Sequence, residues 1–316
     1  MHPFPDGLEL IELRLHPGAP VYAPRQLPAG KRTWSHSAQS AAERCPAAFK
    51  RRYVDRQDDP PTSPMAAGSA FGAALQHFYA GALAGQLPTP EQCLQVAASH
   101  ADERAPDVAF ADGETPATLR DQATEAARAY LTDRAPAVLT AIGSRLESVE
   151  RRFDLRLAGL DEAGRPAECQ WTIRGYLDLE ASDEIRDFKL VGTTHPTQAE
   201  ADRSAQGTLY LLARAAEGRP AERFVLDSTR RSHSARSRTP RFAELASTRP
   251  ERALVALQER IARTTLMVAL CERTGSWPHS TVGWWCAPGR CGAWDTCAGG
   301  ALSAGRAFEP DLAHAA

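Results

Sequence analysis

The feature that most restricts how this 316-residue chain can fold is a pair of short strand-like runs joined by a two-residue turn. Residues 173–181 alternate between two kinds of side chain, the pattern of a strand with one buried face. The Ser-Asp pair at 182–183 favours a tight turn, and residues 184–190 read as a second strand. The sequence therefore predicts a β-hairpin. Strict alternation puts Ile173, Gly175, Leu177 and Leu179 on one face, and Arg174, Tyr176, Asp178 and Glu180 on the other.

The second strand of this hairpin carries two charged residues on one face, Asp187 and Lys189. Asp178 comes from the adjoining strand, so two carboxylates and an ammonium group are expected to converge. Such a set suits a divalent metal ion together with a group that orients or activates water. The alternative is a solvated hairpin with a surface salt bridge. Glu150, on the preceding strand, is either an outer ligand or a surface residue, and Asp183 and Glu184 are interpreted as turn residues.

Composition limits the class of protein. With 43% hydrophobic residues, the chain can bury one sizeable core, or one core with a helical appendage. A formal charge of -2 gives no overall basic character, so any contact with nucleic acid must use local basic patches. No membrane span or signal peptide is evident, so we expect a cytoplasmic protein.

The periodicity divides the chain into parts of different type. The expected fold class is α/β with a helical N-terminal half. Residues 31–300 are expected to form a single domain containing three antiparallel strands followed by a helix and a strand. The expected parts are an extension (1–30), a helical part (31–145), an α/β core (146–230), a C-terminal helix with a cysteine cluster (250–300) and a flexible tail (301–316).

Two helices carry polar residues of interest. In the helix predicted over 66–84, His77 lies beside an apolar stripe, where a single histidine is most often a satisfied polar residue. In the helix predicted over 198–217, Gln206 and Tyr210 are four residues apart and share one face. Ordinary packing between helix and sheet is the alternative for Tyr210.

Three of the seven cysteines lie close together in the sequence. Cys286, Cys291 and Cys297 occupy twelve residues bounded by aromatic side chains. Three thiolates need a fourth ligand to form a tetrahedral or cubane metal site, and Cys45 is the candidate. The three remaining cysteines are isolated within helix or strand patterns and are interpreted as small hydrophobic residues. They are Cys93, Cys169 and Cys271.

In chain order these motifs resemble those of PD-(D/E)xK nucleases of the RecB-like branch, which includes CRISPR-associated exonucleases with iron–sulfur clusters and phage recombination exonucleases. The resemblance covers most of the chain. The matching features are the opening helix over 37–53 with Cys45, the helix with Gly68, Gly72 and His77, Gly-Tyr-Leu-Asp at 175–178, Asp-Phe-Lys at 187–189, the pair Gln206 and Tyr210, and the C-terminal cysteines.

The resemblance implies a restriction-endonuclease-like core, a central mixed sheet flanked by helices. It also implies that His77, Asp178 and Asp187 bind Mg²⁺ or Mn²⁺ together with the Phe188 carbonyl. Lys189 would orient the attacking water or the scissile phosphate, while Gln206 and Tyr210 would contact the substrate or position Lys189.

The same resemblance implies that Cys45, Cys286, Cys291 and Cys297 hold a 4Fe–4S cluster that clamps the C-terminal segment to the N-terminal part. Four residues separate Cys286 from Cys291, whereas many members have two, so Zn²⁺ is the alternative metal.

Binding of DNA would rest on the arginine-rich segment at 229–241, which contains no acidic residue. Its arginines could bind phosphates along a DNA strand, and a solvated surface loop is the alternative. The residues assigned to DNA are Arg230, Arg231, Arg236 and Arg238.

The implied function is a metal-dependent DNA exonuclease in recombination, repair or end processing, located in the cytoplasm of a bacterium or a phage-infected host. The alternatives are an endonuclease, the nuclease subunit of a helicase complex, or a catalytically silent scaffold that binds DNA ends. The expected partners are single-stranded or end-containing duplex DNA and a helicase, recombinase or single-strand-binding protein. The chain itself lacks a Gly-x-x-x-x-Gly-Lys-Ser/Thr run, so a motor would be a separate protein.

Overall fold

The computed structural model describes residues 10–14, 20–24, 32–57, 59–160, 166–168, 171–231, 240–281, 283, 285–288, 290–297 and 299–300. Arg236, Arg238, Cys169 and the predicted tail at 301–316 lie outside these residues. Within the predicted extension, β1 (Leu10–Arg14) and β2 (Pro20–Pro24) form an antiparallel pair.

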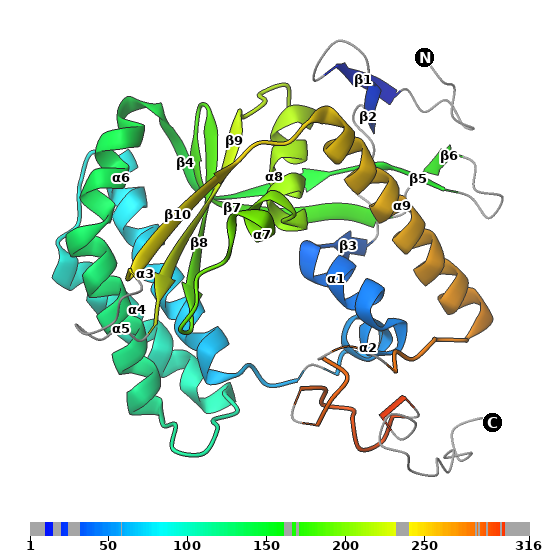
Figure 1. Ribbon diagram of the computed structural model, residues 1–316, viewed down its shortest axis with the longest axis horizontal. Helices are drawn as coiled ribbons and strands as arrows, with labels where there is room; N and C mark the ends of the chain where they lie inside the picture. The colour runs from blue at the N-terminus through cyan, green and yellow to red at the C-terminus, as the bar shows by residue number, and fades with distance from the viewer. Residues whose placement is uncertain are drawn as a thin grey trace.

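A mixed six-stranded sheet forms the centre of the fold (Figure 1). Its order is β10-β9-β8-β7-β3, and β4 also pairs with β7. The β8–β9 and β3–β7 pairs are parallel and the others antiparallel, which confirms the predicted mixed sheet and hairpin. The strands are β3 (Arg32–Trp34), β4 (Leu146–Leu155), β7 (Trp171–Ala181), β8 (Glu184–Val191), β9 (Arg223–Arg230) and β10 (Phe242–Ser247). Strands β3 and β10 were not predicted from the sequence. Strand β5 (Ala158–Leu160) pairs with β6 (Pro166–Glu168) in a separate sheet.

The helices flank this sheet in two groups, with α3–α6 together at one side and α1, α2 and α9 at the other (Figure 1). None of the described helices is both long and apolar enough to cross a membrane. The helices are α1 (His36–Arg44), α2 (Pro46–Phe49), α3 (Ser63–Leu83), α4 (Pro90–Arg104), α5 (Pro116–Asp133), α6 (Ala135–Ile142), α7 (Gln198–Asp202), α8 (Ala205–Ala216) and α9 (Glu251–Thr274).

The predicted opening helix is interrupted at Cys45. Helix α1 begins after Ser35, whose hydroxyl oxygen accepts a hydrogen bond from the Ala38 amide at 3.1 Å, as expected for an N-cap. Cys45 then adopts an extended conformation with φ -162°, so the chain turns before α2. A π-helix follows at Lys50–Val54.

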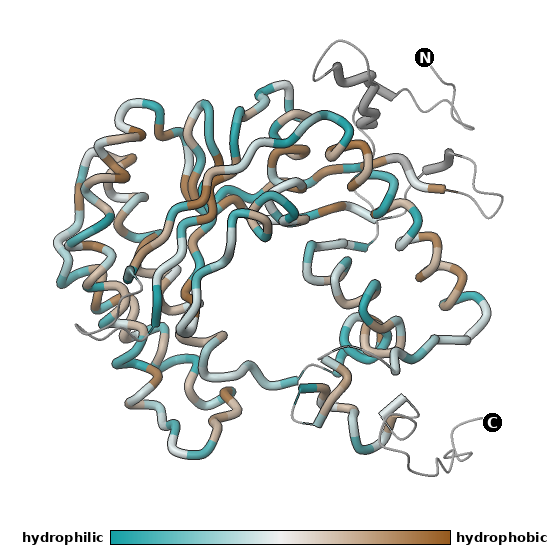
Figure 2. The backbone as a smooth tube through the Cα atoms, viewed as in Figure 1, coloured by the Kyte–Doolittle hydropathy of each residue, from teal (hydrophilic) through white to brown (hydrophobic). Residues whose placement is uncertain are grey.

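Two hydrophobic clusters cover the sheet, and brown apolar segments run along the central strands in Figure 2. One cluster joins the sheet to α1, α8 and α9, and the other joins it to α3–α6. Strand β7 contributes to both, because Leu177 belongs to the first cluster and Leu179 to the second. Residues two apart in a regular strand face the same way, so β7 changes faces at Asp178 and the predicted strict alternation is wrong there.

Strands β7 and β8 separate soon after their turn. Only Leu179↔Arg186 and Glu180↔Ile185 pair between them, whereas β8 pairs with β9 from Glu184 to Val191. Strand β3 pairs with β7 as far as Ile173. In the described sheet, residues 174–178 of β7 therefore have no neighbouring strand on this edge, and Asp178 lies where the two strands diverge.

Two acidic residues near this turn differ in environment. Asp183 is in the turn, as predicted, and forms an ion pair with Arg145. Glu184 was also predicted to be a turn residue, but it is the buried first residue of β8. Its carboxylate forms ion pairs with Arg186 at 2.9 Å and Arg223 at 2.7 Å, which explains why a charge is tolerated there.

Candidate active site

Asp178 is fixed at the point of strand divergence by a backbone group of the other strand. Its Oδ2 accepts a hydrogen bond from the Phe188 amide at 2.9 Å. The β7 backbone does not pair with β8 at this level, so the carboxylate supplies the acceptor that a strand neighbour would otherwise provide. The side chain is thereby directed toward β8.

Asp187 and Lys189 form the second half of the site, on β8. Asp187 is only 1% exposed, and Lys189 Nζ lies 2.9 Å from Asp187 Oδ1 and 2.9 Å from Oδ2. Only the contact with Oδ1 has hydrogen-bond geometry, so the buried Oδ2 accepts no hydrogen bond from the described residues. The Lys189 side chain is 41% exposed and connects this buried carboxylate with solvent.

The charges of these groups depend on one another. Burial, followed by repulsion from Asp187, raises the pKa of Asp178 to about 7. Burial opposes the charge of Lys189, but Asp187 and then Asp178 outweigh it and raise the pKa of Lys189. Lys189 is therefore an ammonium group at neutral pH. Asp178, in contrast, can take up a proton near neutral pH because its surroundings raise its pKa.

Glu150 brings a third carboxylate to this site. Its neighbours on β4 pair as Val149↔Leu179 and Arg151↔Leu177, so Glu150 lies opposite Asp178. Burial and then Asp187 raise the pKa of Glu150. Its φ of 49° is unusual for a residue other than glycine, and such strain tends to persist at functional sites.

Gln206 and Tyr210 approach the carboxylates from α8. Gln206 Nε2 donates a hydrogen bond to Tyr210 Oη at 2.6 Å, as expected for residues four apart on a helix. Tyr210 is 5% exposed, and burial followed by Asp187 and Asp178 raises the pKa of its hydroxyl. The structure therefore brings this pair together with Asp178, Asp187 and Lys189.

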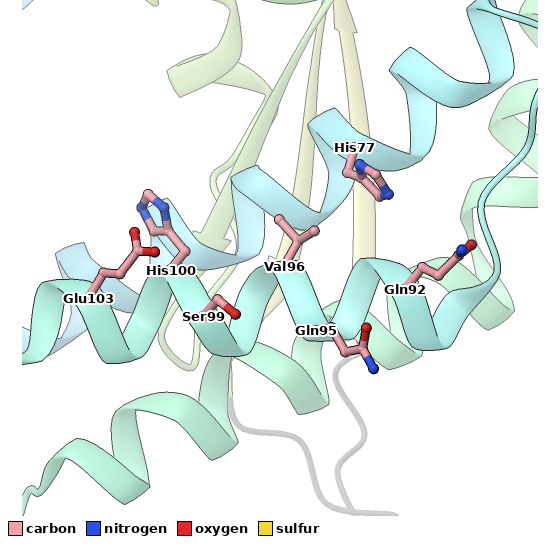
Figure 3. A pocket seen from close by; sticks show the side chains of 7 residues that line it. All are labelled: His77, Gln92, Gln95, Val96, Ser99, His100 and Glu103. Carbon is pink, nitrogen blue, oxygen red and sulfur yellow. The ribbon is translucent and has the colours of Figure 1, made fainter.

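His77 does not join this group. The ring of Tyr79 stacks on Phe188 with centroids 5.5 Å apart, so that face of α3 lies against β8. His77 precedes Tyr79 by two residues, roughly 200° around the helix, and therefore points away. In Figure 3 it faces α4 and lines a surface depression of about 460 Å³, together with Gln92, Gln95, Val96, Ser99, His100 and Glu103. The predicted role of His77 as a ligand beside the two aspartates is not supported by this orientation.

A different histidine, His36, lies near the site. It is the half-buried first residue of α1, and burial followed by the charge of Lys189 lowers its pKa, while Asp187 acts in the opposite direction. No role was predicted for His36 from the sequence. In the sequence, His36 stands out only because it follows Ser35. A serine at that place is sufficiently explained as a helix N-cap and does not indicate a functional site.

The four cysteines predicted to bind metal approach one another. The Ser280 amide donates to Cys45 Sγ at 3.4 Å, and Cys286 Sγ donates to the Ser280 carbonyl at 3.2 Å. Burial raises the pKa of Cys291, with Cys297 and Cys45 contributing in the same direction. In the part of the chain that the structure describes, however, no three His, Cys, Asp or Glu side chains have an arrangement that could hold a metal ion. Cys93 and Cys271 are buried, as predicted.

The arginine-rich segment begins and ends next to β8. The Arg231 amide donates to the Val191 carbonyl at 2.7 Å, and His195 Nε2 donates to the Pro240 carbonyl at 2.9 Å. Lys189 pairs in register with Ser228, three residues before Arg231. The segment therefore leaves the sheet close to Lys189. Arg230, predicted to bind DNA, is only 7% exposed, and its side chain is thus poorly placed to meet a phosphate.

The raised pKa of Asp178 predicts a pH-dependent stability. An unfolded aspartate ionises near pH 4 and folded Asp178 near pH 7, so between these values folding binds a proton and stability falls as pH rises. The substitution Asp178→Asn removes the ionisable group and with it the loss of stability at higher pH. The amide oxygen of the new asparagine can still accept the hydrogen bond from the Phe188 amide. At pH 8 in EDTA the variant should be more stable than the wild type by about 1–3 kcal/mol, with little difference at pH 4.

Urea unfolding at pH 4, 6 and 8 measures this difference, with the exposed residue substitution Asp121→Asn as the matched control. A gain in stability that does not vary with pH would contradict the assignment.

A solved structure named "Putative exonuclease" from Eubacterium rectale matches 81% of this chain and 87% of its own, at 12% identity and a TM-score of 0.47. No curated protein matches. Residues 33–298, which include every described site residue above, match the family model described as the PD-(D/E)XK nuclease superfamily. The chain therefore belongs to the PD-(D/E)XK nuclease superfamily.

Proposed function

We propose that this chain is a Mg²⁺- or Mn²⁺-dependent deoxyribonuclease that hydrolyses phosphodiester bonds from a DNA end. The observation that carries the proposal is the convergence of Asp178, Asp187 and Lys189 where β7 and β8 diverge. Two carboxylates and one ammonium group, open to solvent along Lys189, suit the hydrolysis of a charged ester.

The donor set fits a hard divalent cation. Asp187 Oδ2 is buried and accepts no hydrogen bond from the described residues, and burial beside Asp187 makes ionisation of Asp178 costly. A cation held by these two residues would remove that cost, and Mg²⁺ commonly uses one or two carboxylates and several waters. When bound, it supplies a Lewis acid and lowers the pKa of a coordinated water.

The protein groups around the cation would have separate tasks. Lys189, kept as an ammonium ion by Asp187 and Asp178, acts as a hydrogen-bond donor toward the attacking water or the phosphate and not as a base. Glu150, an accessible carboxylate with a raised pKa, is suited to accept a proton from water. Tyr210 remains protonated and, with its oxygen accepting from Gln206, can donate toward the substrate.

Substrate binding would use the segment that follows β9. Arg231, Arg236 and Arg238 would bind phosphates, since the chain has no overall basic field. The segment is attached through Val191 and His195, just after Lys189, so a bound strand would pass near the site. Action at a DNA end in recombination or repair, and cooperation with a helicase, recombinase or single-strand-binding protein, belong to the same proposal.

We also propose that Cys45, Cys286, Cys291 and Cys297 hold a metal centre, a 4Fe–4S cluster or alternatively Zn²⁺. Supporting this, Ser280 contacts both Cys45 and Cys286, and Cys291 experiences the charges of Cys45 and Cys297. The described side chains do not have ligand geometry, so binding requires the thiols to reorient. The centre would have a structural role, joining the segment after α9 to α1.

The main test of the nuclease is Lys189→Ala. Loss of the ammonium donor should reduce metal-dependent cleavage roughly 100- to 1000-fold while DNA binding is retained. Cleavage of end-labelled single- and double-stranded DNA is measured with Mg²⁺, Mn²⁺ or EDTA, and binding by fluorescence anisotropy in EDTA. Lys50→Ala, which removes an exposed lysine paired with Asp55, is the matched control.

Circular single-stranded DNA should resist the wild-type protein, because an exonuclease needs an end. Cleavage of the circle would show an endonuclease. Tight DNA binding by the wild type without cleavage under any metal would leave only a scaffold.

Two substitutions at Glu150 separate its strain from its charge. Asparagine tolerates a positive φ better than glutamine, and both remove the carboxylate. Glu150→Asn should therefore be about 1 kcal/mol more stable than Glu150→Gln, while both cleave DNA more slowly than the wild type. Thermal unfolding and initial cleavage rates provide the measurements. Equal stability of the two variants, or full activity in both, would remove the functional reading of this residue.

The metal centre has its own test, independent of cleavage. Protein purified anaerobically should contain iron with broad visible absorbance, or zinc without colour, and Cys291→Ser should lose most of it. Cys93→Ser and Cys271→Ser, at buried cysteines outside the group, should keep the metal. Wild-type protein with neither metal would leave the four cysteines as free thiols.

A further inference from the structure

Tyr176 is an exposed aromatic residue in the middle of a largely buried strand. Its exposed fraction is 46%, whereas Ile173 and Leu177 on the same strand are fully buried. No other aromatic residue is among the large hydrophobic side chains that are exposed in the described part of the chain. It precedes Asp178 by two residues, which places the two backbone positions about 7 Å apart.

The strand is constructed so that this ring faces solvent. A Cβ atom at Gly175 would lie 2.5 Å from the Phe153 ring, so β7 is pressed against the core at that residue. The next side chain, Tyr176, points to the opposite face. Because β3 pairs with β7 only as far as Ile173 and β8 pairs only from Leu179, no described strand lies beside Tyr176 on that edge.

Two arginines accompany the ring. Arg152 pairs directly with Tyr176 across the β4–β7 ladder, and Arg174 precedes Tyr176 by two residues. Asp154 holds both guanidinium groups, accepting from Arg152 Nε at 2.9 Å and from Arg174 Nε at 2.6 Å. One carboxylate and two guanidinium groups leave a net positive charge beside the aromatic face. The side chains of Arg152 and Arg174 are 50% and 34% exposed, so they can meet a ligand.

We propose that Tyr176, flanked by Arg152 and Arg174, is a stacking platform for an unpaired nucleobase of the DNA substrate. The proposal rests on the nuclease function and adds the substrate class, an unpaired end. An aromatic face with adjacent positive charge matches a base attached to a phosphate, and such stacking is tolerant of sequence. At roughly 3.4 Å per stacked base, the backbone positions of Tyr176 and Asp178 are about two nucleotides apart along the strand.

This position has a consequence for the choice of substrate. A base within a duplex offers its faces to its stacked neighbours and its edge to its complement, so it cannot also stack on Tyr176. A single-stranded or frayed end meets this requirement directly, whereas a blunt duplex must first separate its terminal pairs at a cost of a few kcal/mol. Single-stranded ends are therefore the preferred substrate.

A scan with abasic nucleotides tests the platform. Single-stranded oligonucleotides carry one abasic site at successive positions from the labelled end, and KM and kcat are measured for the wild type, Tyr176→Ala and Tyr176→Trp. For the wild type, one position should raise KM by about 5- to 150-fold with little change in kcat. Tyr176→Ala should raise KM for intact DNA similarly and be insensitive to the abasic site at that position, while Tyr176→Trp should behave as the wild type.

Leu87→Ala, at a residue 57% exposed and outside this patch, is the matched control, and thermal unfolding confirms that each variant folds. An unchanged KM in Tyr176→Ala, or a rise in KM with no selective position in the scan, would overturn the platform while leaving the nuclease intact. If the wild type cleaves nothing, the nuclease fails instead. Binding of intact and abasic single strands in EDTA then still tests the platform, and equal affinity for both at every position would overturn it.

Discussion

The hydrogen bond from the Phe188 amide to the Asp178 carboxylate replaces a backbone hydrogen bond that a continuous β7–β8 ladder would contain. It lets the two strands separate after two residue pairs without leaving a buried amide unsatisfied. Strand β8 keeps its full pairing with β9, so the positions of Asp187 and Lys189 are determined by β9, while β7 determines that of Asp178. The site depends on this separation, because a continuous ladder would leave no opening between the carboxylates.

The charge imbalance of the site is confined to one face of β8. Three carboxylates face a single ammonium group there, and burial, followed by repulsion from Asp187, raises the pKa values of Asp178 and Glu150. On the other face Arg186 binds Asp227 at 2.7 Å, and Tyr130 donates to the same carboxylate at 3.0 Å. These paired buried charges favour a single arrangement of β8 against β9 and α5. The strand is thus held firmly from one side while its other side keeps a negative charge that a cation can neutralise.

Local sequence patterns were sufficient to predict the features that depend on residues close together in the sequence. Period-two alternation located the hairpin, and a four-residue spacing joined Gln206 to Tyr210. Features that depend on tertiary contacts were missed or misplaced. The change of face at Asp178 lies opposite Glu150, whose positive φ no sequence pattern reveals. The direction of His77 follows from which side of α3 meets Phe188, and β10 could not be separated from the arginine-rich loop before it.

Helix α1 connects the candidate active site with the cysteines. It begins at His36, which experiences the charge of Lys189, and ends at Arg44, directly before Cys45, whose Sγ accepts from the Ser280 amide. Nine residues of helix span about 14 Å, so the two ends move as one rigid unit. The segment after α9 also contacts α2, because the Ala47 amide donates to the Pro278 carbonyl at 3.1 Å. Any bond that ties Cys45 to this segment therefore also restricts where His36 can lie relative to β8, and the proposed metal centre would affect the geometry of the candidate site in this way.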